Sequence, residues 1–321
     1  MTAPSAFITG IAGFAGSWLA EELLAHGWAV AGSVYKDEPL TNIAGFKRNL
    51  TLYKLDILNE KRCREVLGRV KPEYVFHLAA MASVGQSFGK ERLTYQINFD
   101  GTLNILDACR ELTGLKKVLF VSSSDCYGPF KPKNKTLIET QSFNPVSPYG
   151  ISKVASEHLA RYYCRQYDLP VTIARAFNHS GPRQSEHFVI PAFARQVARI
   201  ELGKQEPVMQ VGDLSARRDL SDVRDIVRGY RLLAERGEPG EAYHLCSGKA
   251  VAISRVLNTL VKQASKKITV ETDPTRLRKT EIPVMRGSFE KAHKRVGYQP
   301  RYKLTQTIQD TLEFWRANVY H

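Results

Sequence analysis

A glycine-rich turn between an apolar strand and an apolar helix constrains this chain more than any other stretch. Ala6–Thr9 predicts a strand, and apolar residues recur at helical spacing over 18–24. The turn at 10–16, GIAGFAG, lets backbone N–H groups approach a pyrophosphate at the N-terminus of the helix. Glycine also serves ordinary turns, but a second strand at 28–34 completes the order typical of dinucleotide-binding folds. We therefore expect cofactor contacts from Gly10, Gly13, Phe14, Ala15 and Gly16.

Strand and helix patterns alternate up to Phe177. Further apolar runs predict strands at 52–57, 74–80, 117–121, 171–177 and 242–246, and helical patterns fall at 98–109 and 149–166. This alternation predicts an α/β fold with a doubly wound parallel (Rossmann) sheet.

After Phe177 the pattern changes to loops, a short strand at 211–213, and helices at 188–200, 253–264 and 304–315. We expect residues 1–177, rejoined by 219–247, to form a dinucleotide-binding domain. Residues 178–321 would form a smaller, interleaved substrate domain.

The carboxyl ends of the predicted strands supply further candidate cofactor contacts, because ligands of parallel α/β sheets bind there. Lys36 would accept the 2′-phosphate of NADP(H), although a solvated lysine is the alternative and NAD(H) stays possible. Asp56 could accept from an adenine amino group or cap a helix. His77, alone in an apolar strand, is expected to be structural. The expected contacts at these strand ends are Tyr35, Lys36, Asp56, Ile57, Leu78, Ala79 and Ala80.

Tyr149 and Lys153 are four residues apart in a predicted helix and therefore project from one face. An ammonium beside a phenol lowers the phenol's pKa and makes it a usable acid or base. Ser123 and Ser124 follow a predicted buried strand, where a hydroxyl can donate to a substrate carbonyl oxygen. A serine-rich turn and an ordinary amphipathic helix are the alternatives.

The composition favours a small anionic ligand over nucleic acid. The formal charge of +14 comes from basic residues spread along the 321-residue chain, without a nucleic-acid motif or a basic tail. No apolar run reaches membrane-span length, and no signal-peptide pattern opens the chain. Five scattered cysteines without metal-ligand spacing predict unpaired thiols in the cytoplasm and no metal site. Two of them, Cys126 and Cys246, are expected in the core.

An ordered set of motifs over nearly the whole chain resembles the extended short-chain dehydrogenase/reductases that act on nucleotide sugars. The set is TGxxGFAG at 9–16, HLAA at 77–80, NFDGT at 98–102, Ser123 with Tyr127-Gly128, YGISK at 149–153 and RAFN at 175–178. The stretches at 177–182, 211–213, 218–219 and 278–281 resemble the branch that uses GDP-sugars.

The resemblance implies a role for further residues. Asn98 would join the cofactor contacts, and Asn178 and Arg218 would hold the diphosphate, with Arg183 nearby. Arginine suits phosphate because its planar fork can bond two oxygens. The implied substrate contacts are Ser83, Ser124, Asn178, Arg183, Val189, Arg218, Arg278 and Glu281.

Within this branch the chain looks more like a reductase than a 4,6-dehydratase. The dehydratases place a glutamate as acid/base where this chain has the shorter Asp125. The resemblance implies NAD(P)H-dependent reduction of the 4-keto group of GDP-4-keto-6-deoxy-D-mannose to GDP-D-rhamnose by Ser123, Tyr149 and Lys153. The alternatives are a dehydratase that uses Asp125, a reductase giving GDP-6-deoxy-D-talose, and a non-catalytic cofactor sensor.

The resemblance also implies a homodimer, with a tetramer as an alternative. Family members pair the helices at 98–112 and from 149 onward into a four-helix interface. Leu103 and Tyr162 would face outward there, and a monomer is the alternative. We expect no nucleic-acid or membrane partner.

Overall fold

A parallel seven-stranded sheet forms the centre of the computed structural model, which describes residues 3–130, 136–276 and 282–319. The strand order is β11-β6-β5-β4-β1-β2-β3, with every neighbouring pair parallel. Its strands are β1 (Ser5–Thr9), β2 (Ala29–Val34), β3 (Leu50–Lys54), β4 (Tyr74–His77), β5 (Lys117–Ser123), β6 (Val171–Ala176) and β11 (Ala242–Leu245). This confirms the predicted α/β fold.

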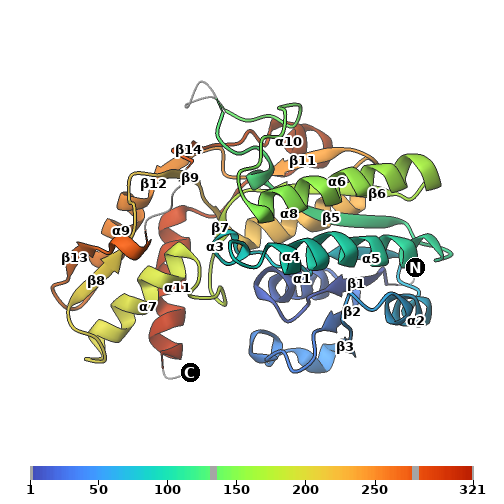
Figure 1. Ribbon diagram of the computed structural model, residues 1–321. Helices are drawn as coiled ribbons and strands as arrows, with labels where there is room; N and C mark the ends of the chain where they lie inside the picture. Colours follow the sequence, from blue (N-terminus) through green and yellow to red (C-terminus); the bar gives the residue numbers. More distant parts are fainter. Residues whose placement is uncertain (1–2, 131–135, 277–281, 320–321) are drawn as a thin grey trace.

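Helices cover both faces of the sheet (Figure 1). One face packs against α1 (Phe14–Ala25), α8 (Val223–Arg236) and α10 (Glu290–Val296). The other packs against α2 (Glu60–Val70), α5 (Gly101–Arg110) and α6 (Pro148–Tyr167), with α3 (Val84–Ser87) and α4 (Glu91–Tyr95) beside α6. Because both faces are covered, the strands are apolar along most of their length, as the sequence indicated.

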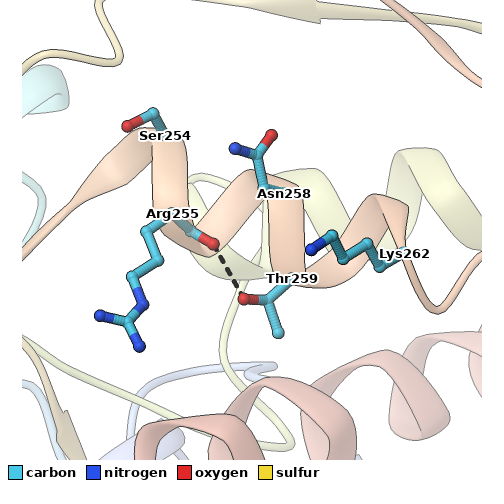
Figure 2. Close-up of a pocket in the computed structure, with 5 residues that line it drawn as sticks. All are labelled: Ser254, Arg255, Asn258, Thr259 and Lys262. Atoms are coloured by element: carbon cyan, nitrogen blue, oxygen red, sulfur yellow. Dashed lines mark hydrogen bonds between the residues drawn. The ribbon is translucent and has the colours of Figure 1, made fainter.

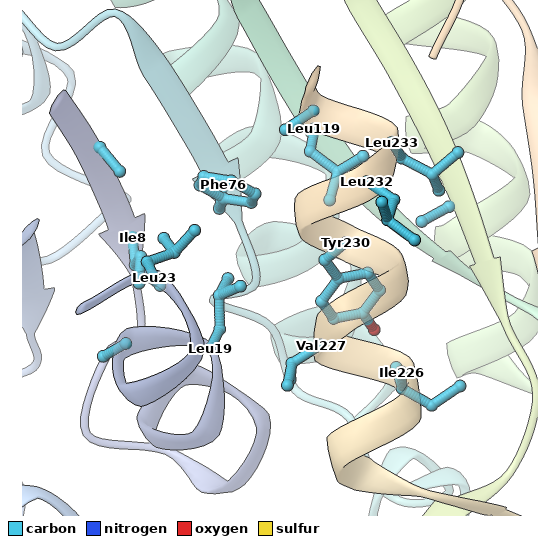
Figure 3. Packing of buried hydrophobic residues seen from close by; sticks show 14 of the residues in the cluster. Ile8, Leu19, Leu23, Phe76, Leu119, Ile226, Val227, Tyr230, Leu232 and Leu233 are labelled. Carbon is cyan, nitrogen blue, oxygen red and sulfur yellow. The ribbon is translucent and has the colours of Figure 1, made fainter. Parts of the chain in front are cut away.

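The core on the α1 side joins distant parts of the chain. Leu19 and Leu23 of α1 and Tyr230 of α8 pack against Phe76 and Leu119 of the sheet, and all five side chains are buried (Figure 3). Burial of this apolar surface is the main force holding α8, over 200 residues from β1 in sequence, against the sheet.

A second group of elements lies beyond the carboxyl end of the sheet (Figure 1). Helices α7 (Val189–Glu201), α9 (Ile253–Val261) and α11 (Leu304–Asn318) share a separate apolar core. The strands β8 (Val208–Val211) and β13 (Thr269–Thr272) pair in parallel. A three-stranded sheet has the order β12 (Ala250–Ala252), β9 (Arg217–Asp219), β14 (Val284–Met285). A separate two-stranded sheet pairs β7 (His179–Ser180) with β10 (Ser221–Asp222).

Two predicted elements differ from the structure. The short strand expected at 211–213 is β8, which ends at Val211, before Gly212. The helix expected from Asn98 is interrupted at its start, since Gln96–Asp100 forms a π-helical turn between α4 and α5. Single π turns inside helices often mark functional sites. The predicted domain boundary at 177/178 stays a prediction.

Candidate active site

The glycine turn after β1 lies where the strand order reverses between β1 and β4, the position at which doubly wound sheets bind ligands. Gly10 has φ +70°, and a Cβ there would lie 3.3 Å from Cα of Ala79. A Cβ on Gly16 would lie 2.2 Å from the carbonyl oxygen of Gly10. Gly13 precedes α1 and has no side chain to cap it. The N–H groups in the first turn of α1 can therefore bind an anion. This cradle fits the pyrophosphate of a dinucleotide.

The ends of β2 and β3 present polar groups on the same side. Lys36, with φ 40°, holds its ammonium 4.9 Å from the centroid of the exposed Tyr35 ring. A side-chain hydrogen bond with Tyr35 raises the pKa of Lys36. Asp56 accepts a hydrogen bond from the Leu58 N–H (3.0 Å), which makes a turn and leaves the carboxylate half-buried. Ile57 is buried, and its side chain lies against Gly101 of α5.

At the end of β4, Thr9 and His77 fix the backbone that follows. The Thr9 hydroxyl accepts from the N–H groups of Leu78 and Ala79, each at 3.0 Å. The buried His77 ring lies between the hydroxyls of Thr9 (2.9 Å) and Thr102 (3.0 Å). Burial lowers the pKa of His77 to about 3, so the ring is neutral. Both ring nitrogens of His77 are thus engaged within the fold, and Leu78, Ala79 and Ala80, which follow it at the carboxyl end of β4, are half-buried.

The catalytic candidates meet where the carboxyl end of β5 lies beside the first turns of α6. Ser147 caps α6 by accepting from the Gly150 N–H (3.0 Å), and Pro148 opens the helix, so Tyr149 lies in its first turn. Ser123 ends β5, and its side chain hydrogen-bonds that of Tyr149. Lys153 lies one turn further on, with its ammonium 6.0 Å from the centroid of the Tyr149 ring. The structure therefore brings the predicted triad together.

Burial controls how the triad titrates. It raises the pKa of Tyr149, and the Asp125 charge adds to this while the hydrogen bond with Ser123 opposes it. Burial also lowers the pKa of Lys153 to about 8. The Lys153 ammonium donates to the Val121 carbonyl at 2.8 Å. The net shift of the Tyr149 pKa is therefore upward, whereas the sequence led us to expect a downward shift. The phenol holds its proton at neutral pH, as a proton donor must.

Asp125 lies on the 3₁₀ turn Ser124–Cys126 that follows β5. One of its carboxylate oxygens accepts from the Ser123 hydroxyl (3.1 Å), and the Ser123 oxygen accepts from the Asp125 N–H (3.1 Å). The carboxylate is thus folded back toward its own turn. Ser124 beside it is buried, as is Cys126, which confirms the predicted core position of that thiol; Cys246 is buried as well.

Asn98 lies in the π-helical turn, and its side chain is fully engaged. It accepts from the Met81 N–H (2.8 Å) and donates to the Met81 carbonyl (3.2 Å) and to the Ser152 hydroxyl (2.9 Å). It therefore ties the segment after β4 to α6, beside Tyr149. Ser83, another predicted contact, caps α3 by accepting from the Gln86 N–H (3.3 Å).

The predicted substrate residues are spread over several loops. Asn178 follows β6 with an exposed side chain, and Val189 opens α7. Arg218 lies on β9 and donates to the Ile282 carbonyl. Arg278 and Glu281 lie outside the described residues. Substrate contact by these residues and by Ser83 and Ser124 stays a prediction.

Arg183 makes contacts that the sequence did not predict. With φ 74°, it forms a two-pronged ion pair with Glu21 of α1 at 2.8 and 3.0 Å. Its guanidinium lies 4.3 Å from the Trp18 ring centroid, and Trp18 donates to the Pro182 carbonyl (3.0 Å). In this structure Arg183 fastens the loop after β7 to α1.

His179 was also missed as a contact of the glycine turn. Its ring stacks on Phe14, with centroids 5.8 Å apart and an interplanar angle of 14°. The only sequence signal was an aromatic residue at position 14 of the turn. The stack joins the predicted cofactor site to the loop that carries Asn178.

A surface depression elsewhere in the molecule lies along α9 (Figure 2). It has a volume of about 390 Å³ and is lined by Ser254, Arg255, Asn258, Thr259 and Lys262, so it contains no predicted site residue. Within residues 3–130, 136–276 and 282–319, no cluster of three His, Cys, Asp or Glu side chains could hold a metal ion. In those same ranges, no helix combines the length and apolar character needed to span a bilayer.

Known proteins match this arrangement over nearly the full chain. The family model described as GDP-mannose 4,6 dehydratase matches residues 7–311. A protein named GDP-6-deoxy-D-mannose reductase, from Pseudomonas aeruginosa, is 32% identical over 313 residues, covering 98% of this chain and 97% of the relative.

Two solved structures share the fold. The structure of RMD from Pseudomonas aeruginosa complexed with NADPH aligns with a TM-score of 0.84 and 30% identity, over 98% of this chain and 100% of the other. UDP-glucose 4-epimerase from Thermus thermophilus, in complex with NAD, aligns with a TM-score of 0.87 and 28% identity, over 97% and 99%. The chain therefore belongs to the GDP-mannose 4,6-dehydratase family, among the NAD(P)-dependent short-chain dehydrogenase/reductases that act on nucleotide sugars.

Proposed function

We propose that this enzyme reduces the 4-keto group of GDP-4-keto-6-deoxy-D-mannose and yields GDP-D-rhamnose. The observation that carries the proposal is the 32% identity, over 98% of this chain, to a protein named GDP-6-deoxy-D-mannose reductase. In addition, the position where a dehydratase is expected to have a glutamate is occupied here by the shorter Asp125, whose carboxylate accepts a hydrogen bond from the Ser123 hydroxyl at 3.1 Å.

The roles follow from the geometry of the triad. Tyr149, kept protonated by burial, donates its proton to the 4-keto oxygen. The Ser123 hydroxyl, which donates to Asp125 in this structure, would turn to donate a hydrogen bond to that oxygen, and the Lys153 ammonium would orient the nicotinamide ribose. The nicotinamide cofactor supplies the hydride to C4.

We further propose NADP(H) as the preferred cofactor. Lys36 stands at the end of β2, where its cationic side chain is exposed and can meet a 2′-phosphate. NAD(H) is the alternative. Asp56, Tyr35 and the glycine turn would contact the rest of the dinucleotide.

The GDP-sugar would lie across the group of elements beyond the sheet, in the proposed 178–321 substrate domain. Asn178 and Arg218 would hold its diphosphate. Further contacts would come from Ser83, Ser124, Val189, Arg278 and Glu281. Arg183 would hold the loop after β7 in place through its ion pair with Glu21.

A 4,6-dehydratase is the second candidate, because the matching family model carries that description. A reductase of opposite stereochemistry, giving GDP-6-deoxy-D-talose, would use the same triad.

Tyr149→Phe tests the assigned acid. Oxidation of NADPH in the presence of the keto sugar would be followed by its absorbance. We expect kcat to fall by about 10²–10⁴-fold while the fold and NADPH binding persist, because only the proton donor is removed. Tyr162→Phe, on the exposed side of the same helix, is the matched control and should keep its activity. Near-full turnover by Tyr149→Phe would refute the assignment.

A further inference from the structure

A buried ion pair lies directly behind the triad. Glu157 of α6 is 0% exposed and Arg175 of β6 is 3% exposed. The guanidinium donates to both carboxylate oxygens, at 2.6 and 3.0 Å. Although burial favours the neutral acid, hydrogen bonding and charge from Arg175 hold the pKa of Glu157 below its ordinary value, so the pair is ionised. Buried ion pairs add little stability over well-packed apolar side chains, so stability alone does not account for this one.

The pair connects the two elements that carry the triad. Glu157 follows Lys153 by four residues and Tyr149 by eight, so all three lie along one face of α6. The hydroxyl of Ser122 donates to Glu157 at 2.9 Å. Ser122 immediately precedes Ser123, so this bond joins the end of β5 to α6 next to the catalytic groups.

The other end of the pair holds the turn that carries Asp125. Arg175 donates to the Glu139 carbonyl (2.7 Å) and to the hydroxyl of Tyr127, the residue that closes the 3₁₀ turn. The Tyr127 hydroxyl also meets the His244 ring of β11. One connected set of buried bonds therefore reaches from α6 through β5 and β6 to β11.

We propose that Glu157 and Arg175, acting through Ser122, are positioning residues that set the separation of Ser123 from Tyr149 and Lys153. The catalytic consequence of this inference rests on the proposed function, but the geometric claim does not. The network is buried, and it joins the two elements from which the reacting groups project.

The test compares two alterations of the network with a remote control. Ser122→Ala removes the bond between β5 and α6 and leaves the ion pair intact. Glu157→Leu/Arg175→Met removes both buried charges together, and Arg161, which also pairs with Glu157 (3.2 Å), keeps its hydrogen bond to the Gly240 carbonyl (2.6 Å). Thr172→Val is the control, because it removes another buried strand hydroxyl, which donates to the Glu238 carbonyl away from the triad. Ser122→Thr keeps the donor and should restore what Ser122→Ala loses.

Two readouts separate positioning from a general structural effect. We expect kcat to fall about 10- to 100-fold in both network variants, with the Kd for NADPH and the Tm close to wild type. Independently of turnover, the pKa of Lys153, followed by ¹³C NMR of its side chain, should rise from about 8 toward 10.5 as water reaches the loosened site. Thr172→Val should change neither quantity.

The outcomes distinguish the two proposals. A wild-type enzyme that leaves the keto sugar unreduced would refute the proposed function, while the Lys153 titration would still decide the geometric claim. Wild-type kcat and an unchanged Lys153 pKa in Ser122→Ala would overturn the positioning role. If the double variant does not fold, Ser122→Ala and Ser122→Thr decide the question alone.

Discussion

At the scale of single residues, burial shifts the pKa values of Tyr149 and Lys153 in opposite directions. Both side chains are buried, and burial favours the neutral form of each. For the phenol this keeps the proton that the proposed reduction consumes. For the ammonium it weakens proton binding, so the titration of Lys153 reports on how well the site is shielded from water.

Lys153 yields a prediction about stability and pH. The folded chain binds the Lys153 proton more weakly than the unfolded chain, so its burial penalty is present below pH 8 and is relieved as the pH rises from about 8 to 10.5. Lys153→Met lacks this penalty throughout. We expect its gain in free energy of unfolding over wild type to shrink by about 2 kcal/mol between pH 7.5 and 9.5. Urea titrations of both proteins at several pH values measure this difference in free energy of unfolding. A difference that does not change with pH would contradict the burial argument.

Sequence patterns located Ser123, Tyr149 and Lys153 because their spacing within a strand end and a helix turn is local. Arg183 shows the limit of such patterns. Its partners Glu21 and Trp18 are about 160 residues away in sequence, and only the packing of the loop on α1 brings them together. Glu157 was missed because a glutamate in a helix is usually solvated, and nothing local marks it as buried.

At the scale of elements, the glycine turn was predictable in its place, and its contact with the cofactor stays a prediction. The spacing of Gly10, Gly13 and Gly16 between a strand and a helix reflects close backbone approach, and the structure has that approach. The π-helical turn was not predictable, because it depends on contacts of Asn98 with Met81 and Ser152 from other elements. The seven-stranded sheet followed from the alternation of apolar runs and helical patterns.

Two helical glycines make a matched pair for testing the turn. In Gly16→Ala the new methyl would lie 2.2 Å from the Gly10 carbonyl oxygen, so the turn must open. We expect binding of NADPH, measured by fluorescence titration, to weaken at least about tenfold, since the backbone N–H groups no longer converge.

The control is Gly68→Ala. This glycine is exposed in α2, and a Cβ there meets nothing within 4 Å. The substitution should stabilise the fold by up to about 1 kcal/mol through helix propensity and leave NADPH binding unchanged. Equal binding by both variants would show that the turn does not contact the cofactor.

At the scale of the whole molecule, the neighbouring helices α5 and α6 suggest how copies of the chain associate. Tyr162 of α6 is 45% exposed, and Leu103 of α5 is partly buried against the sheet-side core. We predict a homodimer through α5 and α6, so Tyr162→Lys should shift the chain toward monomer in sedimentation velocity experiments. Leu202→Lys, after α7 and 43% exposed, is the control and should leave the assembly unchanged. Wild-type chain that sediments as a monomer would contradict the dimer.

Product analysis by NMR tests the central claim most directly. One sample would contain the enzyme with GDP-mannose, and a second the enzyme with GDP-4-keto-6-deoxy-D-mannose and NADPH. The account predicts that the keto sugar is consumed, that GDP-mannose is unchanged, and that the coupling of the C4 proton identifies GDP-D-rhamnose. Conversion of GDP-mannose to the keto sugar without added reductant would instead show that Asp125 serves as a dehydration base, and would contradict the account.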